Sequence, residues 1–345
     1  MPNESPTPPA WTQKGDAELL RTRVCDLQLK IAGSELEGRI EQLGVELEAR
    51  DISFRPHCYL GDEWFSPEDV PAIAIPFYLA HPRLVSLEKK MMLEVEGGEL
   101  SWFQRLLRHE CGHAIEHAYE LHKRRKRQQL FGPRSVEYDP DTYRPRPYSR
   151  SYVRNLPNWY AQAHPDEDFA ETFAVWLDPT VDWRKQYTGW KAVAKLNYVD
   201  ELMKDIGRKP AKVTGGALEF EASRIRTRLE TFYRRRRKQY ATDAPDFYDR
   251  DLRGMFADAS TPETRTLSAA RFLRAHKKEL IDSVSRWTGE RKAAVEILVK
   301  RLTDRAHELD LVLGRDERQT SIEVTAYLAT LVTNYRFTGK FKRSV

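Results

Sequence analysis

The sequence predicts an α+β fold, in which a first domain of helices and a small sheet is followed by a mainly helical C-terminal region. Three observations support this prediction. The chain has 345 residues, enough for two domains with buried cores. Two extended stretches are expected before residue 90, among segments whose apolar residues recur at helical spacing. The last third of the chain has a predominantly helical pattern.

The charge of the chain changes sign along its length. Residues 1–210 carry 29 Lys and Arg against 33 Asp and Glu, whereas residues 211–345 carry 28 against 19. The change coincides with Gly215-Gly216, so we expect one domain at 16–210 and a basic helical domain at 215–345. Residues 1–15 are polar and rich in proline, which predicts a disordered lead-in.

Composition limits the class of protein. Hydrophobic residues make up 40% and charged residues 32%, and no apolar run approaches the length of a membrane span. The N-terminus lacks the basic start and apolar centre of a secretory signal. Only three cysteines occur, which does not suggest a disulfide framework. We therefore expect a cytoplasmic protein.

The first elements follow from local patterns. Asp16 to Leu47 has helical spacing with an interruption near Gly33, and Ser34 followed by Glu37 predicts a capping box at the start of a second helix. Ile52 to Leu60 is expected to form a strand.

A second extended stretch is expected from Ala72 to Leu87. Pro76 cannot donate to a ladder, so this stretch should be an edge strand or contain a bulge. Its Ile73–Ala80 part is a candidate for binding an extended peptide by strand addition.

A second capping pattern, Ser101 with Gln104, predicts a helix that stops before Gly132. Residues 133–160 are rich in Pro, Tyr and Arg and predict a long ordered loop. Pro165, at a favoured first helical position, should begin a helix that ends near Asp178.

The predicted helix after Ser101 contains His109-Glu110-Cys111-Gly112-His113, an H-E-x-x-H pattern. Helical residues four apart share one face, so His109 and His113 can bind one Zn²⁺ together. Glu110 would lie beside the metal, where it can act as general base toward bound water. Chance occurrence is the alternative, because the pattern fixes only three positions.

A third protein ligand is needed. One class of such enzymes uses a histidine ten positions after the first, but Tyr119 occupies that position and Glu116 replaces the expected glycine, so that class is excluded. His117 lies about 80° round the helix from His109, at about 100° per residue, and is more simply a partly buried histidine.

The segment HPDEDFAETFAVWL offers a better candidate. Glu167 and Glu171 are four residues apart, and Ala170 and Ala174 beside them would allow close approach to the first helix. The acidic first turn by itself could simply complement the helix dipole. That explanation does not cover Glu171, which lies among apolar residues and needs a partner.

A glutamate followed four positions later by an acidic residue on a second helix resembles the gluzincin metallopeptidases, which include thermolysin. The order E-x-F-A-E-x-F from Glu167 to Phe173 is similar to that of anthrax lethal factor. Residues 17–203 also resemble a bacterial family of uncharacterised zinc-binding metallopeptidases. The resemblance implies a zincin-like domain with Glu167 as third ligand, Glu171 as hydrogen-bond partner of His109, and a single zinc ion.

In lethal factor a tyrosine seven residues before the ligand glutamate assists the oxyanion. The same spacing here gives Tyr160, with Tyr152 as the fallback. His164 could be a cleft residue or belong to the helix cap, and both remain open.

The resulting hypothesis is a zinc metallopeptidase that cleaves peptides or proteins, with Glu110 as base and Tyr160 as oxyanion donor. The alternative is a zinc-binding interaction protein, or an amidohydrolase acting on other amides, whose region 215–345 binds a partner. The basic runs 123–127 and 234–238 have no accompanying nucleic-acid motif. We therefore interpret them as solvated helical faces or contacts to an acidic protein, and do not expect nucleic acid as a partner.

Overall fold

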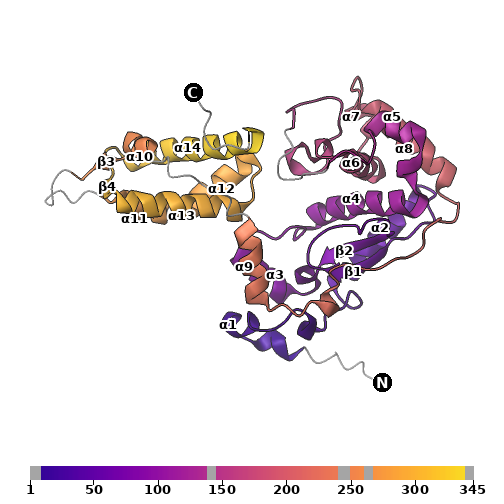
Figure 1. Ribbon diagram of the computed structural model, residues 1–345, viewed down its shortest axis with the longest axis horizontal. Helices are drawn as coiled ribbons and strands as arrows, with labels where there is room; N and C mark the ends of the chain where they lie inside the picture. The colour runs from indigo at the N-terminus through magenta and orange to yellow at the C-terminus, as the bar shows by residue number, and fades with distance from the viewer. Residues whose placement is uncertain (1–8, 138–144, 240–248, 260–266, 339–345) are drawn as a thin grey trace. The chain divides into compact units, whose positions relative to one another are not determined.

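The computed structural model describes residues 9–137, 145–239, 249–259 and 267–338. Contacts divide the chain into two compact units. Unit 1 comprises residues 1–90 and 95–232, and unit 2 comprises residues 91–94 and 233–345. Figure 1 shows a small sheet surrounded by helices in unit 1 and a helical unit 2. The mainly helical α+β composition predicted from the sequence is confirmed at this level.

Unit 1 contains the candidate site. Besides several 3-10 turns, its described elements are α1 (Asp16–Leu19), α2 (Glu35–Ala49), β1 (His57–Gly61), β2 (Ala72–Pro76), α3 (Pro82–Met92, whose last residues belong to unit 2), α4 (Leu100–Tyr119), α5 (Arg125–Phe131), α6 (Pro165–Leu177), α7 (Trp183–Gln186) and α8 (Val193–Ile206).

The second extended stretch is shorter than predicted. Strand β2 ends at Pro76, a 3-10 turn covers Phe77–Ala80, and α3 begins at Pro82. Pro82 explains why a helix begins here, because proline fits the first turn of a helix, where no N–H is needed. The prediction of extended structure to Leu87 was therefore wrong.

Strand β2 is also not an open edge. It pairs in parallel with β1. On its other side the Ala74 amide donates to the Phe65 carbonyl at 2.8 Å. All five of its residues are buried. Burial of Ala72–Pro76 and of the following turn leaves no exposed ladder there, so we no longer propose Ile73–Ala80 as the peptide-binding strand.

Ser34 caps α2 as predicted, and Glu37 reaches back across the helix start, although both bonds are displaced by one residue from a capping box. The Ser34 hydroxyl accepts from the Leu36 amide at 3.2 Å, and the Glu37 carboxylate accepts from the Gly33 amide at 2.9 Å. The first bond satisfies one of the amides that a helix start leaves without partners, and the second ties the residue before the cap to the first turn.

Helix α4 begins and ends differently from the prediction. Its cap is Glu99, without a side-chain bond, and Ser101 is already helical. Gln104 does not complete a capping box, because its amide donates to the Arg39 carbonyl of α2 at 3.0 Å. The helix ends at Tyr119, where Glu120 takes a left-handed conformation (φ 53°), and α5 follows as a separate helix.

Helices α4 and α6 pack against each other at very short range, side by side in Figure 1. A Cβ atom at Gly112 would lie 2.8 Å from Ala170 Cα and 3.1 Å from its carbonyl oxygen. Glycine and alanine at this crossing therefore allow the two backbones to approach, as the small residues of α6 predicted. The approach brings the acidic residues of α6 to the histidines of α4.

Unit 1 extends further along the chain than the composition predicted, to Phe232 rather than to the region of Gly215. Segment 225–230 returns to the N-terminal segment: Val24 and Cys25 amides donate to the Thr227 and Ile225 carbonyls, and the Leu229 amide donates to Thr22. These long-range bonds have no signature in charge or composition. Whether region 215–345 acts as a separate functional domain stays a prediction.

Unit 2 is built mainly from helices, which share one apolar core containing Phe272, Val284, Val295 and Leu328. Its described elements are most of α9 (Leu229–Gln239, which begins in unit 1), α10 (Asp249–Met255), β3 (Ala257–Asp258), α11 (Ala269–Ala275), α12 (Lys277–Thr288), α13 (Lys292–Glu308), β4 (Leu311–Val312) and α14 (Glu317–Thr338). Strands β3 and β4 form a short antiparallel pair. Among the described residues of the whole chain, no helix is both long and apolar enough to cross a membrane.

Candidate metal centre

Two histidines of α4 present their ring nitrogens to the same point. His109 and His113 lie one turn apart, and their Nε2 atoms are 3.2 Å from each other. His109 is 2% exposed, which removes water as a competing partner. The spacing predicted from the motif is therefore realised on one face of a continuous helix.

Helix α6 supplies a carboxylate to the same point. Glu167 Oε2 lies 3.0 Å from His109 Nε2 and 3.3 Å from His113 Nε2. Tetrahedral zinc with bonds of about 2.0–2.1 Å holds its ligand atoms roughly 3.3 Å apart. Among the described residues, these three side chains form the group whose ligand atoms converge closely enough to hold a metal ion. Their donor chemistry and separations fit zinc.

Glu171 fixes the orientation of His109. Its Oε1 atom lies 2.8 Å from His109 Nδ1, and it accepts from the Asn155 side-chain amide at 2.8 Å. Its Oε2 atom accepts from the Leu156 backbone amide at 2.8 Å. A carboxylate at Nδ1 keeps the proton there and leaves the Nε2 lone pair for a metal. Glu171, which lies among apolar residues in the sequence, thus has three hydrogen-bond partners.

The charges of the site oppose the effect of burial. Burial alone would lower the pKa of His109, but its hydrogen bonds to Glu167 and Glu171 raise that pKa well above the ordinary value. Burial raises the pKa of Glu167, yet the neighbouring His113 and His109 hold it well below its usual range. Protons therefore compete with a metal ion for the histidines, and metal binding should weaken as the pH falls.

Glu110 follows His109 on α4 and is 5% exposed. Burial raises its pKa, and this outweighs the opposing effect of the two histidines. Its Oε2 atom is buried and has no hydrogen-bond partner among the described residues. Such an atom normally has a partner, so an acceptor left open beside a group of metal-ligand type suggests a place for a water molecule.

Tyr160 lies beside the histidines. Its ring centroid is 5.7 Å from that of His109. The two preceding residues, Asn158 and Trp159, both have left-handed backbones, with φ of 67° and 54°. Consecutive non-glycine residues in this region cost of order 1–3 kcal/mol each, and such strain persists only where surrounding contacts impose it.

Tyr152, the fallback, has different neighbours. The Lys195 ammonium lies 4.2 Å from the centre of its ring, and the same ammonium pairs with Asp168. The geometry therefore favours Tyr160 over Tyr152 as the tyrosine nearest to the histidines.

Two other histidines are placed outside the ligand group. His117 Nδ1 lies 3.7 Å from Asp69, and burial, with the positive charge of nearby groups, lowers its pKa to about 4. His164 is the cap of α6: its Nδ1 accepts from the Asp166 amide at 3.1 Å, and its Nε2 donates to the Val136 carbonyl at 3.0 Å. Of the two roles considered for His164, the structure therefore shows that of a helix cap.

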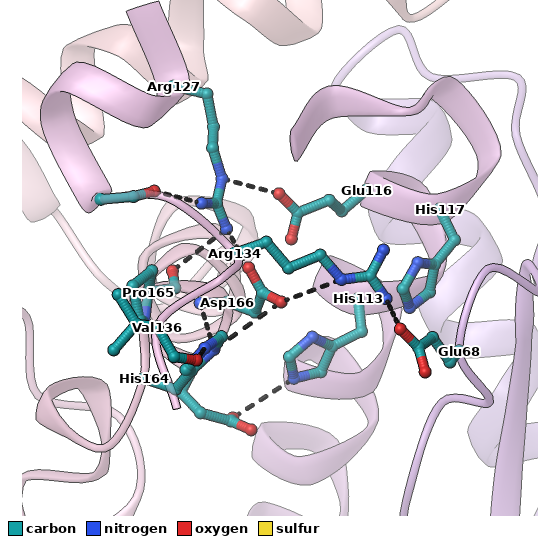
Figure 2. Close-up of polar contacts among 12 residues, drawn as sticks. Glu68, His113, Glu116, His117, Arg127, Arg134, Val136, His164, Pro165 and Asp166 are labelled. Atoms are coloured by element: carbon teal, nitrogen blue, oxygen red, sulfur yellow. Dashed lines mark hydrogen bonds and ion pairs between the residues drawn. The ribbon is translucent and has the colours of Figure 1, made fainter. Parts of the chain in front are cut away.

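One functional neighbour was missed by the sequence analysis. Arg127 belongs to the basic run interpreted as a solvated face, but it is fully buried. Its Nε lies 2.7 Å from Glu116 Oε1, and its Nη2 pairs with Asp166. Figure 2 shows Arg127 between these two carboxylates. The available signal was Glu116 itself, an acidic residue on the apolar part of α4.

Arg134 continues this network. Its guanidinium pairs with Glu68 at 2.9 Å, and its Nε lies 3.6 Å from Asp166 (Figure 2). It also pairs with Asp69 at 2.7 Å. The loop after α5 is thereby tied both to the start of α6 and to the segment that precedes β2. Together, Arg127 and Arg134 hold the end of α6 that carries Glu167.

Comparison with known proteins gives one match. Residues 105–204 match a family model described as "Putative zinc-binding metallo-peptidase". Neither the curated proteins nor the solved structures gave a match. The matched segment contains the H-E-x-x-H residues, Glu167 and Glu171. Over that segment the chain is similar to a family of zinc-binding metallopeptidases.

Proposed function

We propose that this chain is a zinc-dependent metallopeptidase that hydrolyses peptide bonds at the centre formed by His109, His113 and Glu167. The observation that carries the proposal is the convergence of their three ligand atoms within 3.0–3.3 Å of one another. Three protein ligands leave a fourth position open, which is typical of catalytic rather than structural zinc. The family match supports the same class of activity.

Zinc bound at these ligands would polarise the scissile carbonyl and lower the pKa of a bound water to about 7. Glu110 then has the role of general base, because its buried Oε2 is an acceptor without a partner among the described residues. Its raised pKa also suits it to hold the proton and return it to the leaving amine.

Two further residues complete the proposed machinery. Tyr160, with its ring 5.7 Å from that of His109, would donate a hydrogen bond to the developing oxyanion. Glu171 would keep His109 in the orientation and tautomer that a metal requires. The gluzincin-like assignment of these roles rests on the order of residues in α6 and on this geometry.

The test compares the wild type with Glu110→Gln, a variant that keeps size and ligands but removes the base. We expect one zinc per chain in both proteins and peptide cleavage only in the wild type, measured by metal analysis and by mass spectrometry of a broad peptide library. Cleavage by both proteins would contradict the role of Glu110. Zinc binding without cleavage by either would favour the alternative of a zinc-binding interaction protein or another amidohydrolase.

A further inference from the structure

Two arginines in the loop before α6 lie against aromatic rings. The guanidinium of Arg154 lies 5.6 Å from the ring centre of Tyr148 and 5.0 Å from that of Trp190. The guanidinium of Arg150 lies 6.0 Å from the same Trp190 ring. Both arginines are exposed, and neither forms an ion pair with a carboxylate in the part of the chain that the structure describes.

The backbone beneath both arginines is anchored. The Arg154 amide donates to the Tyr187 hydroxyl at 3.0 Å, and Tyr187 is buried. The Arg150 carbonyl accepts from the Ala192 amide at 3.1 Å. Stacking against the rings further restricts Arg154, so less conformational freedom would be lost when it binds a ligand.

The same loop borders the metal centre. Asn155 and Leu156, which follow Arg154 directly, both donate to Glu171, the partner of His109. Further along, Trp159 contacts Tyr148 at a ring distance of 5.8 Å and precedes Tyr160. The loop that carries Arg154 is thus hydrogen-bonded to the glutamate that orients His109.

The aromatic contacts hold two positive charges at the same place. A single cation over an aromatic ring is a common structural contact. Here the guanidinium groups of two arginines lie against the same ring, which places two positive charges at one point of the surface. Some arginines of unit 1, such as Arg83 and Arg108, lie against carboxylates, whereas Arg150 and Arg154 have aromatic neighbours instead. Within the described ranges, the donor groups of both guanidinium groups therefore remain available for an anionic ligand.

We propose that Arg150 and Arg154 form a subsite for a carboxylate of the peptide substrate. The planar guanidinium is suited to bind a carboxylate through two parallel hydrogen bonds. The proposal rests on the metallopeptidase function above and names its substrate class, peptides with an acidic side chain or a free C-terminus near the scissile bond.

The test uses the zinc-loaded full chain with Glu110→Gln, so that peptides bind without being cleaved. Matched fluorescent peptides differ only in Glu against Gln, or in a free against an amidated C-terminus, which separates the two sources of carboxylate. We expect one of these carboxylates to tighten binding by on the order of tenfold or more. Adding Arg150→Gln and Arg154→Gln should abolish that preference, whereas adding Arg125→Gln, an exposed arginine of α5, should preserve it.

Arg154→Lys keeps the charge but loses the planar donor pair, so it should retain only part of the preference. Melting temperatures check that each variant is folded. Equal binding of carboxylate and amide peptides, or a preference that survives loss of both arginines, would overturn the subsite. Cleavage of neutral and acidic peptides at equal kcat/KM would refute the subsite but leave the peptidase intact. Selective binding of carboxylate peptides without any cleavage by the wild type would refute the peptidase function but leave the subsite intact.

Discussion

Replacing Glu171 by glutamine should weaken metal binding without removing a ligand. The glutamate accepts hydrogen bonds at both oxygens, from Asn155 and His109 at Oε1 and from Leu156 at Oε2, each at 2.8 Å. Glutamine has the same shape but only one acceptor oxygen. If that oxygen faces His109, its amide group meets the Leu156 N–H, and two donors oppose each other.

The magnitude follows from these contacts. One buried donor left without its partner costs about 1–3 kcal/mol of unfolding free energy. Loss of the carboxylate behind His109 should lower zinc affinity about 10- to 100-fold, the usual effect of removing such a partner. That range corresponds to about 1.4–2.7 kcal/mol of binding free energy.

Competition with a chromophoric zinc chelator measures the affinity, and urea unfolding of the metal-free protein measures the stability. Glu88→Gln is a matched control, because Glu88 is a buried carboxylate of α3 at 1% exposure. It should leave zinc affinity unchanged. A folded Glu171→Gln protein that binds zinc as tightly as wild type would refute the argument that Glu171 supports the metal through His109.

Three further predictions concern neighbouring features. Gly112→Ala places a Cβ 2.8 Å from Ala170 Cα, about 0.7 Å inside normal contact. The two helices should separate, which should lower the free energy of unfolding in urea by about 1–3 kcal/mol and weaken zinc binding. An unchanged unfolding free energy and zinc affinity would contradict the close crossing. Tyr160→Phe should keep zinc content and KM but lower kcat about 100-fold or more, as loss of an oxyanion donor does; an unchanged kcat would exclude Tyr160. His117 has a folded pKa of about 4 against an ordinary value of 6.5. The unfolded chain therefore binds the proton first as the pH falls, and stability from this residue is present above pH 6.5 and lost by about 3 kcal/mol toward pH 4. His117→Asn should flatten that part of the pH dependence of unfolding free energy in the metal-free protein, and an unaltered curve would contradict the assignment.

Local rules predicted those features that depend on neighbouring residues. The capping bonds of Ser34 and Glu37 and the start of α6 at Pro165 were predictable because their partners lie within four residues. The same holds for the shared face of His109 and His113. The Ser101 cap failed because Gln104 instead finds a partner on α2, 65 residues away.

The basic run 123–127 shows a second limit. Its charges predict solvent exposure, yet Arg127 is buried because two carboxylates from α4 and α6 surround it. A buried charge is tolerated only with such partners, and the sequence of the run does not indicate which residues they are. The extension of unit 1 to Phe232 was likewise missed, because it depends on backbone bonds to residues near the N-terminus.

The sequence by itself determined the metal-ligand chemistry, because the 3.6-residue period of a helix places the two histidines, and separately Glu167 and Glu171, on common faces. Only the tertiary structure decided that the two pairs meet. Gly112 and Ala170 let α4 and α6 approach, and the 2.8 Å contact between His109 and Glu171 spans 62 residues of sequence. The physical reason is that helix periodicity is a local property of the chain, whereas convergence of ligands depends on packing between segments that are distant in sequence.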